Sequence, residues 1–277
     1  MRVGTVSLGQ IATFLILFSL LPISSRAAVF WDDEMESGST GWVGPFESRF
    51  TDTCGGVNWG SFDTVNKVSG TASLKLNFPG MAYHDACGGF TDKYFPGTTD
   101  LWARWYVRLS PGFILDSVQT KMMNQSTDGQ QSNWWGFLWG TNEVTVQLQN
   151  YPTNGNTKNF NPNVGSGSVP IDGSWVCIET RTKLNTVGQA DGALEAYKNG
   201  VRFMNYTGLE IRKVSQGTQN NLFVFNRIFR QHGSGSLNYD RLAFGNTRIG
   251  CLGSIPAPSI PPPSNGSIAA PSNLSVR

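Results

Sequence analysis

The chain has 277 residues, of which 14% are charged, 12% are aromatic and 32 are glycine. So few charges and so much glycine exclude a coiled coil, while the apolar and aromatic content excludes a disordered chain. The 21 Lys and Arg residues against 19 Asp and Glu residues give a net charge of +2, which is too balanced for an electrostatic nucleic-acid binder.

The N-terminus has the pattern of a secretory signal peptide. A basic Arg2 precedes an apolar run at residues 11–18, and Ser25 and Ala27 place small residues where a signal peptidase reads them. An uncleaved anchor helix is the alternative, but the run is shorter than the ~20 residues that span a membrane. We therefore expect residues 1–27 to be removed, and the mature protein to be secreted, periplasmic or extracellular, with no membrane segment.

Residues 28–252 read as strand after strand, with no helical periodicity. Apolar and polar residues alternate at residues 73–78, 101–109, 144–149, 175–184, 194–206, 222–229 and 237–244. Asn199-Gly200 separates two such runs and predicts a type I′ hairpin turn. So many strands predict one all-β domain, a jelly-roll β-sandwich of two curved antiparallel sheets.

The four cysteines agree with export, because an even number suits disulfides in an oxidising compartment. Three pairings are open. We favour Cys54–Cys87, since both lie in polar glycine-rich stretches, and Cys177–Cys251, since one lies in a strand and the other at the end of the domain. No two cysteines have the C-x-x-C spacing of a zinc site.

The composition changes at residue 253. Six of the fourteen prolines lie in residues 253–277, among Ser, Ala, Gly and Asn. Such a segment predicts an extended linker or tail without a core of its own. Its last residues resemble the opening of a fibronectin type III domain.

Five segments in order give the domain a family resemblance: GTASLKLNF, LWARWYVRLSPGF, DGSWVCIETRTKLNT, DGALEAYKNGVRF and LNYDRLAFGNTRIG. This order resembles the concanavalin A-like jelly-roll superfamily, and within it the secreted lyases of alginate, glucuronan and heparin. The likeness is one of strands and turns, which indicates fold more directly than activity. It implies β-elimination on an acidic, uronate-containing polysaccharide with no required cofactor. Structural calcium is common in such folds, but no ligand cluster in this sequence identifies a calcium site.

The catalytic motifs of these lyases are incomplete in this sequence. One alginate-lyase branch carries a Y-x-K-x-x-x-Y strand near the end of the domain, where residues 225–232 have Phe and Arg in place of Tyr and Lys. A second branch has a lysine soon after the ARWYVRL strand. Lys121 falls at that position, although the glycine-rich motif that usually follows is missing.

A uronate lyase must neutralise the sugar carboxylate, remove the neighbouring proton and protonate the leaving oxygen. We expect His232 or Lys121 to take the proton and Tyr106 to donate one. The expected substrate-binding residues are cationic, amide-bearing or aromatic, and alternation places most of them on polar strand faces: Arg104, Arg108, Arg230, Asn226, Gln147, Gln149 and Trp135. Each has a structural alternative, namely a solvated charge for the arginines and Lys121, a turn position for His232 and core packing for the tryptophan.

A second hypothesis belongs to a different functional class. The tryptophan-rich stretch at residues 134–139 could stack on sugars in a non-catalytic carbohydrate-binding or cell-surface module, tethered through the proline-rich tail. In either case we expect a monomer whose partner is an acidic polysaccharide rather than nucleic acid or a membrane.

Overall fold

A computed structural model of the chain describes residues 29–36, 60–79, 89–117, 119–127, 132–149, 157–212, 223–231 and 233–253. Within the strands, the side chains of residues 79, 89–96, 132, 223–227 and 229–231 are not described. The expected signal peptide, the proline-rich tail and the Cys54–Cys87 pair therefore lie outside the described residues.

Every regular element of the described part is a strand. The strands are β1 (Val29–Asp33), β2 (Gly60–Asp63), β3 (Ser73–Pro79), β4 (Gly89–Thr98), β5 (Asp100–Leu109), β6 (Gln119–Thr127), β7 (Ser132–Leu138), β8 (Val144–Gln149), β9 (Lys158–Phe160), β10 (Trp175–Lys183), β11 (Gly192–Lys198), β12 (Val201–Leu209), β13 (Phe223–Gln231) and β14 (Ser234–Gly245).

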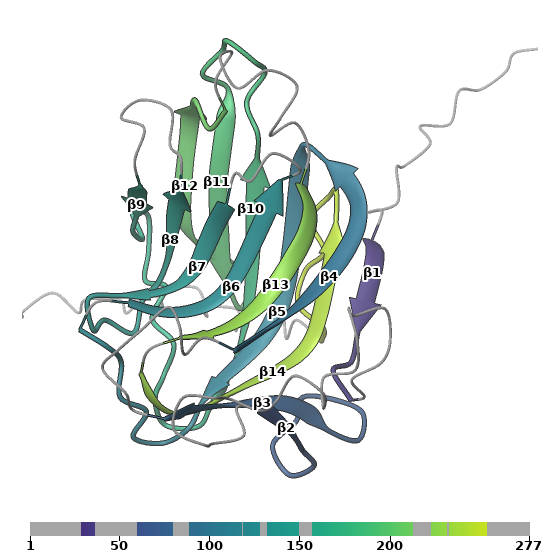
Figure 1. Ribbon diagram of the computed structural model, residues 1–277, viewed down its shortest axis with the longest axis vertical. Helices are drawn as coiled ribbons and strands as arrows, with labels where there is room; N and C mark the ends of the chain where they lie inside the picture. The colour runs from purple at the N-terminus through teal and green to yellow at the C-terminus, as the bar shows by residue number, and fades with distance from the viewer. Residues whose placement is uncertain are drawn as a thin grey trace, which may run out of the picture.

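The strands form two antiparallel sheets that lie one on the other (Figure 1). The eight-stranded sheet has the order β12-β11-β10-β5-β14-β3-β2, with β1 also paired to β14. The six-stranded sheet has the order β4-β13-β6-β7-β8-β9. This arrangement confirms the predicted all-β sandwich.

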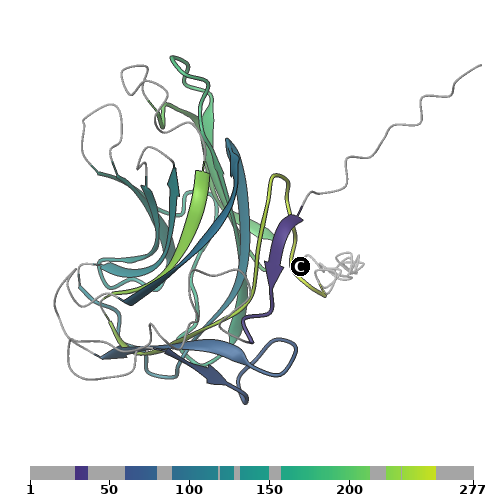
Figure 2. The same ribbon diagram turned by 45° about the vertical axis from the view of Figure 1, so that its right-hand side comes forward.

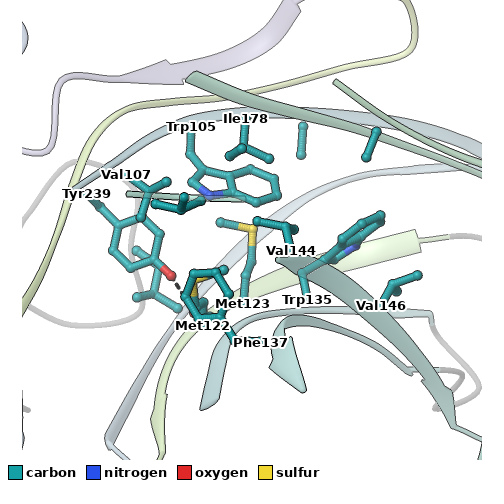
Figure 3. Packing of buried hydrophobic residues seen from close by; sticks show 14 of the residues in the cluster. Trp105, Val107, Met122, Met123, Trp135, Phe137, Val144, Val146, Ile178 and Tyr239 are labelled. Atoms are coloured by element: carbon teal, nitrogen blue, oxygen red, sulfur yellow. Dashed lines mark hydrogen bonds between the residues drawn. The ribbon is translucent and has the colours of Figure 1, made fainter. Parts of the chain in front are cut away.

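Strand β5 shows why the two sheets pack together. Its alternate residues Leu101, Ala103, Trp105 and Val107 are fully buried in the core between the sheets. Trp135 of the six-stranded sheet packs in the same core as these β5 side chains (Figure 3). Burying large aromatic and aliphatic side chains of this kind contributes about 1.5–3 kcal/mol each, which makes the layer the main source of stability.

The β11–β12 hairpin confirms the turn predicted from Asn199-Gly200. The two residues have φ angles of 50° and 84°, the left-handed values that a type I′ turn requires. Asn199 also accepts a hydrogen bond from the backbone N–H of Cys177 through its side-chain oxygen, at 2.9 Å. The turn is thus tied to the neighbouring strand β10.

The face of the eight-stranded sheet that points away from the core is closed by the chain that follows β14. Cys177 of β10 forms a disulfide with Cys251, which confirms that predicted pairing. Beside it, the fully buried carboxylate of Glu179 accepts hydrogen bonds from Arg248 and from the backbone of Ile249 and Gly250. The disulfide and the carboxylate hold the end of the domain against the sheet.

Candidate functional site

The outer face of the six-stranded sheet, which points away from the eight-stranded sheet, carries a row of polar and aromatic side chains. Asn124 of β6 is paired across the strands with Trp134 of β7, then Gln147 of β8, then Asn159 of β9. Cross-strand partners share a face, so these four side chains line up. The Gln147 amide donates a hydrogen bond to the Asn159 side-chain oxygen at 3.1 Å.

A β-bulge in β6 brings Lys121 to this outer face. Lys121 is paired with Gly136 and Met123 with Trp135, so Met122 is one extra residue in β6. Strict alternation would have placed Lys121 on the side of Met123, in the core. The extra residue reverses the alternation, and the Lys121 ammonium lies 4.7 Å from the centre of the Trp134 ring.

Glycine at position 136 is needed for the close approach at this bulge. A Cβ atom there would lie 2.2 Å from the carbonyl oxygen of Thr120. No side chain fits at that distance, so β7 can approach the bulged strand only through a glycine. The sequence shows this glycine within a tryptophan-rich stretch, but the reason for it appears only in the strand pairing.

Tyr239 of β14 supports the bulge from the opposite sheet. Its hydroxyl crosses the core and donates a hydrogen bond to the Met122 carbonyl oxygen at 2.8 Å (Figure 3). Tyr239 is fully buried, and burial raises the pKa of its hydroxyl well above the ordinary value. The hydroxyl therefore stays protonated and serves as a fixed donor to the extra residue of the bulge.

Among the side chains that the structure describes, the outer face combines a cation, several amides and an aromatic ring. Lys121 is 8% exposed and Asn124 is buried, whereas Trp134, Gln147 and Gln149 are partly exposed. An ammonium over an aromatic face is held by cation–π attraction. Ammonium and amide N–H groups can donate to a carboxylate, and an aromatic face can stack on a sugar ring.

The predicted site residues of β5 lie elsewhere. Arg104 is buried on the outer face of the eight-stranded sheet, where its guanidinium contacts Asp32 at 3.2 Å. Tyr106 donates its hydroxyl to the Leu252 carbonyl oxygen at 3.0 Å, and burial raises its pKa. Arg108 lies farther along the same strand, on the same side. The structure therefore does not bring these residues together with Lys121, in contrast to the expected shared site.

Trp135 corrects another expectation. It is fully buried between the sheets, and its indole N–H donates to the Gln125 side-chain oxygen at 3.3 Å. It is therefore a core residue and not a surface for sugar. Its neighbour Trp134 occupies the outer face instead. Gln147 and Gln149 do lie on the expected polar face of β8.

The remaining predicted residues belong to or follow β13. Asn226 and Arg230 lie in this strand, but their side chains are outside the described part, as is all of His232. The backbone of β13 does connect this strand to the candidate site. Gln231, which precedes His232, is paired with Lys121.

In the described ranges, no group of three or more His, Cys, Asp and Glu side chains could hold a metal ion. No helix in those ranges is long and apolar enough to cross a membrane.

Comparison with known proteins indicates the fold. No protein-family model matches the chain, and no curated protein matches its sequence. Among solved structures, it is similar to the cellulose induced protein Cip1, with 17% identity over 80% of this chain and 100% of that one and a TM-score of 0.53. It is also similar to the marine PL-14 alginate lyase of Aplysia kurodai, with 14% identity over 79% and 99% of the chains and a TM-score of 0.52. Alginate lyase vAL-1 from Chlorella virus matches with 13% identity over 68% and 89% and a TM-score of 0.51. The chain therefore has the jelly-roll β-sandwich fold that these polysaccharide lyases have.

Proposed function

We propose that the outer face of the six-stranded sheet binds an acidic, uronate-containing polysaccharide and that the protein cleaves it by β-elimination. The observation that carries this proposal is the bulge, which turns Lys121 onto the same face as Trp134 and the amide row. That face offers a positive charge and N–H donors for a carboxylate. The fold shared with two alginate lyases supports the proposal.

The proposed reaction uses the carboxylate to acidify the neighbouring carbon. Lys121, with the amides of Gln147 and Gln149, neutralises the carboxylate and so stabilises the negative charge that develops when the adjacent proton leaves. His232, which follows the backbone partner of Lys121, takes that proton while Lys121 stays a charged ammonium. In the alternative, Lys121 is the base in its neutral amine form, and the amides of Gln147 and Gln149 then hold the carboxylate without it. The electron pair forms a carbon–carbon double bond, the bond to the glycosidic oxygen breaks, and that oxygen receives a proton from the protonated base or from water. No cofactor enters this scheme.

The experiment follows ultraviolet absorbance of the unsaturated uronate product with alginate, glucuronan and heparin-type polymers. Wild-type protein is compared with Lys121→Met, His232→Ala and a control, Lys183→Met, at the end of β10 in the other sheet. We expect Lys121→Met to lower kcat/KM by about 100-fold, because one charge-stabilising group is lost, and Lys183→Met to leave it unchanged. Full activity of Lys121→Met, with an unaltered melting temperature, would contradict the role of this face.

Non-catalytic binding of polysaccharide is the second candidate function. The partial exposure of Trp134 beside Lys121 favours it, because a ring and a cation suffice to hold an acidic sugar without any base. Binding of the same polymers without growth of the product band would select this function.

Export of the protein to an oxidising compartment is part of the proposal. The disulfide between Cys177 and Cys251 supports it, since such bonds persist mainly outside the cytosol. Analysis of the mature N-terminus after expression in a secreting host tests it. Cleavage near residue 27 is expected, and an intact N-terminus would contradict it.

A further inference from the structure

A second candidate site lies beside the turn between β7 and β8. An open pocket of about 680 Å³ lies there, and its polar lining residues are Thr141, Asn142, Glu143, Ser166 and Ser168. Leu115 and Ile171 add an apolar part to the lining. None of these residues belongs to the outer face of the six-stranded sheet described above.

Trp139 is not among the lining residues, but it belongs to the turn that borders this pocket and has an unusual backbone conformation. It directly precedes the lining residue Gly140, and the two have φ angles of 52° and 69°. The backbone N–H of Thr141 donates to the Leu138 carbonyl oxygen at 3.2 Å, which closes a type I′ turn. The first central position of such a turn favours Asn, Asp or Gly, since other side chains are strained there.

Packing does not explain a tryptophan at this position, because 57% of it is exposed. Strained conformations of this kind persist mainly where function requires them. An exposed indole is a large flat surface with a single N–H, which suits stacking on the C–H face of a sugar ring.

The polar lining of the pocket is held in place by its own hydrogen bonds. The Ser166 hydroxyl donates to the Glu143 carboxylate at 3.0 Å and accepts from the Ser168 backbone N–H at 3.2 Å. Glu143 and Ser168 are also joined by a β-bridge. The carboxylate is thus oriented before any ligand arrives, and its second oxygen can accept hydrogen bonds from ligand hydroxyl groups.

The charge of the pocket indicates the class of ligand. Glu143 is the one charged side chain among the residues that line the pocket, so the lining itself is acidic. The Lys198 ammonium lies beside it and donates to the Ser168 carbonyl oxygen at 3.0 Å. An acidic pocket repels a uronate and accepts the hydroxyl groups of a neutral sugar. This preference is opposite to that of the outer face, where Lys121 supplies a positive charge.

We propose that this pocket is a binding site for a neutral hexose unit of a glycan. The sugar ring stacks on Trp139, and its hydroxyl groups donate to Glu143. The site does not depend on cleavage of an acidic polymer, because no residue is shared with the outer face of the six-stranded sheet.

The test is isothermal titration of the full chain with cellohexaose, mannohexaose and an alginate hexasaccharide. We expect at least one neutral hexasaccharide to bind, and Trp139→Ala and Glu143→Gln each to weaken that binding about tenfold or more. The control is Val201→Ala, which changes another exposed apolar residue beside a hairpin turn. Binding of the alginate hexasaccharide should be the same in Trp139→Ala as in the wild type. If neither neutral ligand binds, or if Trp139→Ala binds as the wild type does, the proposal is wrong.

Trp139→Asn separates a ligand-binding role from a structural one. Asn tolerates the left-handed conformation, so this variant should melt about 2 °C higher than the wild type while losing the neutral sugar. A lower melting temperature would mean that the ring stabilises the fold, which would overturn the argument from strain.

Discussion

Replacing Tyr239 by Phe tests whether the bulge in β6 orients Lys121. The change keeps the buried ring and removes the hydroxyl that donates to the Met122 carbonyl oxygen at 2.8 Å. The carbonyl then loses a buried partner, which costs about 1–3 kcal/mol. At about 2 kcal/mol, a domain of this size should melt roughly 6 °C lower. The free energy of unfolding in urea measures this loss directly.

The same variant should affect the proposed reaction. A looser bulge leaves the Lys121 ammonium less fixed, so we expect kcat for uronate elimination to fall several-fold, with a smaller change in KM. Tyr197→Phe is the matched control, because it removes a hydroxyl that donates to Glu195 at 2.6 Å in the other sheet. If Tyr239→Phe lowers stability but keeps the wild-type kcat, the bulge does not orient Lys121. If its stability falls by less than about 0.5 kcal/mol, the hydrogen bond itself does not matter.

Three further predictions concern the eight-stranded sheet. Glu179→Ala removes the acceptor of three hydrogen bonds, two of them from backbone N–H groups and one from the partly exposed Arg248. It should lower the free energy of unfolding in urea by about 2–3 kcal/mol, and a loss under 1 kcal/mol would contradict the anchoring role. The double change Cys177→Ser and Cys251→Ser opens a link across a sequence separation of 74 and should cost about 4 kcal/mol, measured against the wild type under oxidising conditions. Burial raises the pKa of Asp240 from 3.8 to about 6. The protonated carboxyl therefore makes its full contribution to the free energy of unfolding below pH 4, and this contribution is lost as the pH rises through 6. Asp240→Asn should remove this decline of about 1–2 kcal/mol, and an unchanged pH profile of unfolding would refute the assignment.

Local patterns were sufficient to predict much of the fold. Alternation in residues 101–109 correctly separated the core side of β5 from its polar side, because a strand with one face in the core must alternate. Asn199-Gly200 predicted a hairpin turn because few residue pairs tolerate its backbone angles. The Cys177–Cys251 pairing was predicted from position along the chain.

The candidate site could be predicted only in part, because strand pairing between distant segments decides which polar face is available. The polar side of β5 looked like a substrate surface, but Asp32 and Leu252, both far away in sequence, contact it. Lys121 was identified by its position in a resemblance, while its orientation depends on an extra residue that alternation does not reveal. Trp134 and Trp135 are adjacent in sequence, and only the register of β7 shows which of them is buried.

The position of β14 has a consequence for the order in which the protein folds. This late strand lies between β5 and β3, and its last residues pair with β1, so that Val29 is opposite Gly245 (Figure 2). Strands β1, β2 and β3 leave the ribosome early, yet they join the eight-stranded sheet only through β14. Strands β2 and β3 can pair with each other early, since they are neighbours in the sheet. Their joining to β5, and the pairing of β1, must wait until nearly the whole domain has been synthesised, which favours slow folding.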